Sequence, residues 1–161
     1  MRIKIAKRWY EKVKVAIGSD HGGYKLKENI KKYLEELHVE YKDFGCMSEA
    51  STDYPDVGYK VSNEVKNGNY ERGILICGTG IGMSITANKV KGIRASLCSD
   101  VFSAQKTREH NDANVLTFGE RVIGIGLARK IVKKWLFTEF SKGERHIKRL
   151  NKLKIIEEQF S

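Results

Sequence analysis

The chain has 161 residues, of which 40% are hydrophobic, and a formal net charge of +10 at pH 7. This length suits a single domain with a sizeable core. The sequence has no apolar run of the roughly 18–20 residues that a membrane-spanning helix requires, and its first residues lack the apolar centre of a secretory signal. We therefore expect a cytoplasmic protein with no membrane partner.

The positive charge is concentrated at the two ends of the chain. Residues 1–14 carry six Lys or Arg against one Glu, and residues 141–161 carry six against three. A nucleic-acid-binding domain is expected to gather basic residues on one face of its fold. The distribution therefore favours solvated termini, with a C-terminal site for an anionic ligand as the alternative. We assign no function to the basic N-terminal extension, residues 1–12.

The cysteines argue against a disulfide framework and a zinc site. The chain has three of them, Cys46, Cys77 and Cys98, and no two form a CxxC pair. An odd count without paired spacing is not typical of disulfide-rich or zinc-binding domains. It fits a reducing compartment, and we expect no metal.

The first half of the chain predicts strand, helix, strand, turn and helix. Residues 13–20 form an apolar, β-branched run that ends in Gly, Ser and Asp, which is typical of a buried strand. Residues 24–37 place leucine and isoleucine at helical spacing between charged residues. The elements that follow are a strand at 39–45, a turn at 51–58 around the only proline, and a helix that ends at Gly68. Thr52 or Asp53 could cap that helix.

The second half continues the alternation. The patterns predict strands at 73–78, 93–100 and 114–119, and helices at 83–90, 101–111 and 126–140. A last amphipathic helix, 146–160, lies beyond the alternating pattern. Its apolar stripe consists of Leu150, Leu153, Ile156 and Phe160. The stripe needs a partner surface, either on the same domain or on a second copy of the chain.

The order of elements predicts the fold class. Continuous apolar strands separated by helices indicate a parallel sheet that is covered on both faces, and right-handed crossovers then give a doubly wound sheet. We expect an α/β, Rossmann-like αβα sandwich with a five-stranded parallel sheet and an extra C-terminal helix, formed as one domain by residues 13–161. Ligands in such folds bind beyond the carboxyl ends of the strands. The sequences SDHGG, CGTGIG, CSD and FGER lie there.

Alternating glycines follow the strand predicted at 73–78. Gly78, Gly80 and Gly82 would let backbone N–H groups approach an anion at the start of a helix. The spacing is GxGxG instead of the GxGxxG of dinucleotide sites, and no Walker-type Lys follows. Asp100, about twenty residues further on, is the feature that favours a nucleotide. A tight strand-to-helix corner is the structural alternative.

Cys77 ends the strand that leads into these glycines. A buried cysteine is usually a small apolar residue, and Cys46 and Cys98 fit that description. At Cys77, N–H groups of the following helix would stabilise a thiolate, which can act as a nucleophile or a base. The N–H groups of Gly78–Gly82 and the hydroxyl of Thr79 could hold an oxyanion. This combination suits acyl transfer or proton abstraction beside a carbonyl.

Two histidines have polar neighbours at element ends. His21 follows Asp20 after the first strand, and His110 precedes Asn111 at the end of a helix. We expect the fold to bring both histidines near the carboxyl edge of the sheet. A thiolate base and a histidine acid would form an acid–base pair.

Two arginines near the C-terminus have helical spacing. Arg145 and Arg149 are four residues apart, so they share one face of a helix. Two guanidinium groups on one face can clamp a phosphate. A solvated basic tail is the alternative.

Five motifs occur in order across roughly residues 13–150. They are IGSDHGGYKLKE (17–28), TDYPDVG (52–58), GILICGTGIGMSITANKVKGIRA (73–95), REHNDANVLTFGERV (108–122) and GERHIKR (143–149). Their combination resembles the ribose-5-phosphate isomerase B family, together with its galactose-6-phosphate and allose-6-phosphate isomerase relatives. Some members of the family use a glutamate base, whereas this chain resembles the cysteine type.

The resemblance implies an aldose–ketose isomerase that uses neither metal nor cofactor. The expected reaction interconverts ribose 5-phosphate and ribulose 5-phosphate, in the pentose phosphate pathway, with a hexose 6-phosphate as the alternative substrate. Cys77 would move the proton between C1 and C2, and His110 would open the sugar ring. The segment Gly78–Gly82, including Gly80 and Ile81, would hold the enediolate together with Thr79.

The resemblance also assigns the substrate contacts. Asp20 would handle substrate hydroxyls, and the phosphate ligands would be His21, Arg145 and Arg149. The other substrate contacts would be Tyr54, Asn111 and Arg121.

Members of this family are dimers whose active sites use residues of both subunits. The resemblance therefore implies a homodimer, possibly a tetramer, with the C-terminal helix at the dimer interface. We expect no nucleic-acid partner. A nucleotide- or nucleic-acid-binding module remains the more distant alternative, and the candidate base, acid and phosphate clamp argue against it.

Overall fold

Five short strands form one parallel sheet in the computed structural model, which describes residues 13–160. The strands are β1 (Lys14–Ser19), β2 (Glu40–Asp43), β3 (Arg72–Cys77), β4 (Ala95–Leu97) and β5 (Val115–Gly119). Their order is β2-β1-β3-β5-β4, and every neighbouring pair is parallel. The winding reverses between β1 and β3, and ligands of open α/β sheets bind at such a point. The predicted fold class is confirmed.

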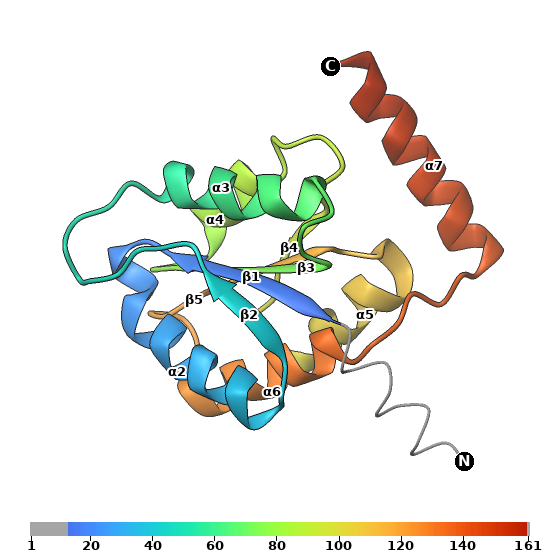
Figure 1. Ribbon diagram of the computed structural model, residues 1–161. Helices are drawn as coiled ribbons and strands as arrows, with labels where there is room; N and C mark the ends of the chain where they lie inside the picture. Colours follow the sequence, from blue (N-terminus) through green and yellow to red (C-terminus); the bar gives the residue numbers. More distant parts are fainter. Residues whose placement is uncertain (1–12, 161) are drawn as a thin grey trace, which may run out of the picture.

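Helices cover both faces of the sheet (Figure 1). They are η1 (His21–Gly23, a 3-10 turn), α2 (Tyr24–Glu36), α3 (Tyr54–Lys66), α4 (Ile81–Ala87), α5 (Val101–Asn111) and α6 (Ile125–Leu136). Helices α2, α5 and α6 lie on one face, and α3 and α4 lie on the other. Their apolar stripes supply the two outer walls of the core.

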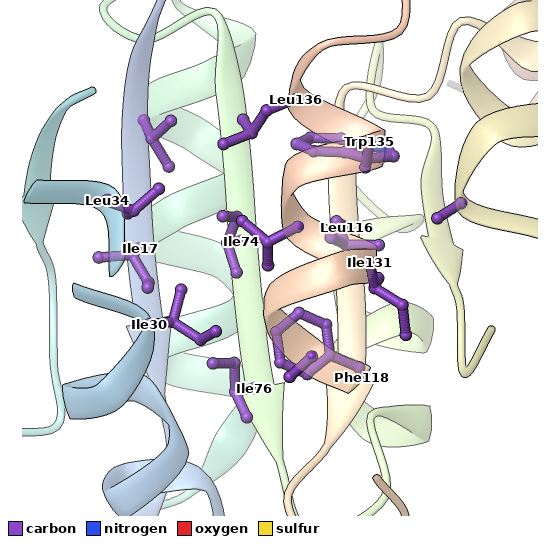
Figure 2. Packing of buried hydrophobic residues seen from close by; sticks show 14 of the residues in the cluster. Ile17, Ile30, Leu34, Ile74, Ile76, Leu116, Phe118, Ile131, Trp135 and Leu136 are labelled. Carbon is purple, nitrogen blue, oxygen red and sulfur yellow. The ribbon is translucent and has the colours of Figure 1, made fainter. Parts of the chain in front are cut away.

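Two apolar clusters fill the space between the layers. Successive strand residues point to opposite faces, so Ile74 and Ile76 join the cluster under α2 and α6 (Figure 2), whereas Leu75 and Cys77 join the cluster under α3 and α4. The central strands are therefore buried on both faces, which explains their continuous apolar runs. Trp135 is fully buried in the first cluster.

Element boundaries differ from the sequence predictions in several places, and α4 spans Ile81–Ala87 instead of 83–90. The strand predicted at 93–100 spans only Ala95–Leu97, so Cys98 follows the strand and is buried there. Helix α6 ends at Leu136 instead of at residue 140. Helix α3 begins at Tyr54 and includes part of the predicted turn, because Pro55 stands in its first turn. A proline there loses no helical hydrogen bond.

The predicted cap of α3 is confirmed in position and wrong in its hydrogen bond. Asp53 is the N-cap residue, but its side chain makes no capping hydrogen bond. The hydroxyl of Thr52 donates instead to the carbonyl of Ala50 at 3.1 Å. Thr52 is occupied by the loop before the helix.

The last helix, α7 (Glu144–Gln159), extends from the sandwich beside α5 (Figure 1). His146 is its only buried residue. Leu153 and Ile156 are half exposed, and Phe160 is 86% exposed. With the segment 88–94, α7 borders a groove of about 800 Å³. The predicted apolar stripe is therefore left largely uncovered by the rest of the same chain.

The predicted N-terminal extension, residues 1–12, lies outside the described residues. Among residues 13–160, no helix is long and apolar enough to cross a membrane.

Candidate active site

The glycine segment forms a tight corner between β3 and α4. Gly80 has a φ of +82°, and a Cβ there would lie 2.7 Å from backbone atoms of Phe118. A Cβ on Gly82 would lie 2.8 Å from the ring of Tyr54. Only glycine fits such close approaches without displacing neighbouring atoms. The corner thus brings backbone N–H groups close to the end of β3.

Cys77 lies inside this corner. Its side chain is 5% exposed, and the N–H of Gly80 donates a hydrogen bond to its Sγ at 3.0 Å. Thr79 is engaged similarly, since its Oγ1 accepts a bond from the N–H of Ile81 at 3.2 Å. An N–H donor directed at sulfur stabilises negative charge on it.

Asp20 and His21 occupy the neighbouring strand end, after β1. Asp20 is buried, and its Oδ1 has no hydrogen-bond partner among the described residues. Burial raises the pKa of Asp20, although His21 and the N–H groups of Gly22 and Gly23 act against the rise. His21 is exposed, and its Nδ1 lies 3.2 Å from both the N and the O of Thr52. The Oδ1 atom is therefore both buried and unsatisfied by the described residues.

Arg121 and Tyr54 complete this side of the site. The guanidinium group of Arg121 lies against Gly78, where an added Cβ would come within 3.3 Å of it. The ring of Tyr54 lies against Gly82, and the residue Tyr54 is 41% exposed.

We call the residues at this edge of the sheet the carboxyl-edge group. The register pairs Ser19 with Ile76 and Cys77 with Gly119, so the three central strands end together. The group consists of Asp20, His21, Tyr54, Cys77, Gly78, Thr79, Gly80, Ile81, Gly82 and Arg121. The structure brings these predicted residues together in one chain.

The other predicted residues lie beside the amino ends of the strands. The carbonyl of Asn111 accepts a bond from Nε of Arg94 at 2.9 Å, and Arg94 immediately precedes β4. The carbonyl of Asn114 accepts a bond from the N–H of Gly73 at 2.9 Å, near the start of β3. Gly73 and Cys77 are four residue steps apart along the strand, a distance on the order of 13 Å.

The expectation that His110 lies near the carboxyl edge is therefore wrong within one chain. Each right-handed crossover carries its helix back toward the amino ends of the strands. His110 and Asn111 stand at the end of α5, so the helix places them at the amino edge. We call His110, Asn111, Arg145 and Arg149 the α5–α7 group.

His146 contacts this α5–α7 group, although no sequence pattern gave it a role. Its ring stacks on that of His110, with centroids 4.3 Å apart and an interplanar angle of 10°. Nε of Arg145 lies 3.3 Å from Nε2 of His146. Burial, and then the positive charges of His110, Arg145 and Arg149, lower the pKa of His146. Sequence spacing carries no signal for this contact, because it joins two helices.

Asp100, which favoured a nucleotide site, caps α5. Its carboxylate accepts bonds from the N–H and the hydroxyl of Ser103, both at 2.7 Å. No group of three or more His, Cys, Asp or Glu suited to a metal ion occurs within residues 13–160.

Comparisons with known proteins point to one family. The family model described as ribose/galactose isomerase matches residues 15–153. The chain is 57% identical to the putative sugar phosphate isomerase YwlF of Bacillus subtilis, over 91% of this chain and 99% of that one. It is 48% identical to the ribose-5-phosphate isomerase B of Escherichia coli, over 91% and 97% of the two chains.

A different substrate name and a solved structure occur among the similar proteins. The chain is 45% identical to the D-erythrulose-4-phosphate isomerase of Pectobacterium atrosepticum, over 80% of this chain and 86% of that one. The ribose-5-phosphate isomerase B of Clostridium thermocellum matches with a TM-score of 0.91 and 52% identity, over 92% and 100% of the chains.

Proposed function

The chain belongs to the ribose/galactose isomerase family and is a sugar-phosphate isomerase, and from this membership we propose that it interconverts ribose 5-phosphate and ribulose 5-phosphate. The observation that carries the proposal is the buried thiol of Cys77, which accepts a hydrogen bond from the N–H of Gly80. A base beside a backbone oxyanion site is what proton transfer next to a carbonyl requires.

In this proposal Cys77 transfers one proton between two carbons of the open-chain sugar. The thiolate removes the proton from C2 of the aldose, and the electron pair of that C–H bond forms the enediolate while negative charge moves to the carbonyl oxygen. The thiol then returns the proton to C1 while the hydroxyl proton on the C2 oxygen moves to the C1 oxygen, so that C2 becomes the carbonyl of the ketose. Backbone N–H groups of Gly78–Gly82 and the hydroxyl of Thr79 stabilise the charged oxygen.

Other side chains bind the parts of the sugar that do not react. The unpartnered Oδ1 of Asp20 accepts a hydrogen bond from a substrate hydroxyl. His21, Arg145 and Arg149 hold the phosphate, and within residues 13–160 neither arginine has a carboxylate partner to compete with it. Binding the remote phosphate helps to position C1 and C2 at the base. Tyr54, Asn111 and Arg121 supply further contacts.

A site that includes both groups of residues needs two copies of the chain. His110, which we assign to ring opening, lies at the edge of the sheet opposite Cys77. We therefore propose a homodimer in which the α5–α7 group of one copy faces the carboxyl-edge group of the other. Exposed apolar residues near the carboxyl ends of β3 and β4 offer a contact surface, namely Ile81, Ile85, Leu97 and Phe102. The uncovered stripe of α7 offers another.

A second candidate substrate is a sugar phosphate of different length. The Pectobacterium relative is named for D-erythrulose 4-phosphate, a four-carbon substrate, and the family description includes galactose. A hexose 6-phosphate, allose or galactose 6-phosphate, would use the same base and the same oxyanion site.

The test is isomerisation of ribose 5-phosphate beside D-erythrulose 4-phosphate, allose 6-phosphate and galactose 6-phosphate. We expect the highest kcat/KM with ribose 5-phosphate and a loss of at least about 10³-fold in Cys77→Ala. The variant should keep the fold, measured by circular dichroism. Turnover of another sugar alone would change the substrate and keep the mechanism. A Cys77→Ala variant with near-normal rates would refute the thiolate base.

A further inference from the structure

Lys27 is a fully buried cation outside the two groups of site residues. Its Nζ donates to Oδ2 of Asp43 at 2.6 Å and to the carbonyl of Cys46. It also lies 5.4 Å from the centroid of the Tyr24 ring. A lysine is almost never fully buried without partners. Here the two hydrogen-bond acceptors lie at the end of β2 and just after it, and Glu28 of α2 adds an ion pair at 3.6 Å. Lys27 therefore connects α2 to the end of β2 and the segment that follows it.

The segment is the loop between β2 and α3, residues 44–53. Its first residues continue along β1: the N–H of Cys46 donates to the carbonyl of Ser19 at 2.5 Å, and the N–H of Ser19 donates to the carbonyl of Gly45 at 2.6 Å. Oδ1 of Asp43 accepts a bond from the N–H of Gly45 at 3.0 Å. Lys27 thus holds the loop by a hydrogen bond at the point where the loop leaves the sheet.

The far end of the same loop reaches the carboxyl-edge group. Thr52 contacts Nδ1 of His21 through its backbone N and O. Two residues later, Tyr54 begins α3 and lies against Gly82. His21 and Lys27 both lie on the η1–α2 unit. The loop is therefore fastened to this unit twice, once by the buried lysine and once by the site histidine.

We propose that Lys27 is a positioning residue: by holding the carbonyl of Cys46 and the carboxylate of Asp43, it fixes loop 44–53 so that Thr52 orients His21 and Tyr54 covers Gly82. The inference rests on the proposed function of the carboxyl-edge group. Lys27 acts through the loop and makes no contact with substrate.

Lys31 provides the control that distinguishes this positioning role from a general contribution to stability. Its Nζ also pairs with Asp43, at 2.9 Å, and with Glu28, but it does not reach Cys46. Replacing either lysine by methionine keeps most of the side-chain volume and leaves Asp43 one cationic partner. A buried ion pair often contributes little to stability compared with apolar packing. Only Lys27→Met removes the hold on the loop.

The experiment compares Lys27→Met with Lys31→Met and the wild-type protein. Ribose 5-phosphate kinetics gives KM and kcat, thermal melts give Tm, and hydrogen exchange of residues 47–53 reports the loop directly. For Lys27→Met we expect KM to rise about tenfold while kcat changes by less than about threefold. We also expect the Thr52 amide to exchange about tenfold faster. Lys31→Met should leave KM and this exchange rate at wild-type values.

The outcomes separate the proposal from the function on which it rests. A Lys27→Met variant with wild-type KM and loop exchange would overturn it, even if Tm falls. Should Lys27→Met fail to fold, Lys27→Gln is measured in the same way, and failure of both while Lys31→Met folds would show a purely structural role. If the wild-type protein turns over no ribose 5-phosphate, the proposed function fails, and loop exchange alone decides whether Lys27 positions the loop.

Discussion

The surroundings of Asp20 disfavour the charged form of its carboxyl group. It is buried at the end of β1, one of its oxygens has no partner among the described residues, and burial raises its pKa. A structural carboxylate is normally paired when buried. A buried carboxylate oxygen without a partner carries a cost in stability.

This cost gives a prediction with a definite sign. Because folding raises the pKa of Asp20, its contribution to stability is fully present below the ordinary value of 3.8 and is lost as pH rises through the raised value. Asp20→Asn stays neutral. We expect a Tm higher by a few degrees at pH 7.5, together with turnover reduced about 10–100-fold.

The pH dependence provides the control. The Tm advantage of Asp20→Asn should shrink as pH falls toward 4. Asp100 has the opposite sign, because its bonds from Ser103 lower its pKa, so Asp100→Asn should lower Tm at pH 7.5. A Tm loss in Asp20→Asn at pH 7.5 would contradict our account of this residue.

At the scale of elements, the β3–α4 corner combines a steric demand with a chemical one. Gly80 adopts a left-handed φ, and the same residue directs its N–H at Sγ of Cys77. The two roles cannot be separated by looking at the loop alone. A glycine elsewhere in the chain has the same backbone strain without the contact: Gly92 has a φ of +85°, and a Cβ added there would meet nothing within 4 Å.

Comparing Gly80→Ala with Gly92→Ala separates these roles. Gly92→Ala meets only the left-handed strain, about 1 kcal/mol. Gly80→Ala adds the clash with Phe118, so we expect about 2–4 kcal/mol of lost stability in urea unfolding. The shift of its N–H away from sulfur should also lower kcat at least about tenfold at a temperature where the variant is folded. Equal kcat values in the two variants would show that the Gly80 N–H does not contribute to catalysis.

The elements also show what sequence patterns can and cannot predict. Apolar runs placed β1, β3 and β5 within one or two residues, because burial on both faces leaves a continuous signal. The short edge strand β4 was overestimated, since the apolar residues around it continue beyond the ladder. The carboxyl-edge group was predictable because strand ends share one edge. The position of His110 was not, because it depends on the direction in which α5 returns, and the contact with His146 joins two separate helices.

At the scale of the whole molecule, our proposal divides the site between two parts of one chain. The carboxyl-edge group has a candidate base and an oxyanion site, and the α5–α7 group has a candidate acid and two arginines. A closed dimer with two-fold symmetry would pair each half with its complement twice. The half-exposed stripe of α7 is what such an arrangement would bury.

Mixing inactive variants tests this arrangement. In a heterodimer of Cys77→Ala and His110→Ala, one site receives native residues from both copies and the other receives both substitutions. After subunit exchange at equal concentrations, half of the dimers are mixed, so we expect about one quarter of wild-type activity. Mixing Cys77→Ala with Asp20→Asn is the matched control, because both changes fall in the same group and every site stays defective. No recovery in the first mixture, despite demonstrated exchange, would place the complete site within a single chain. Recovery in the control would show that Cys77 and Asp20 of one site come from different copies.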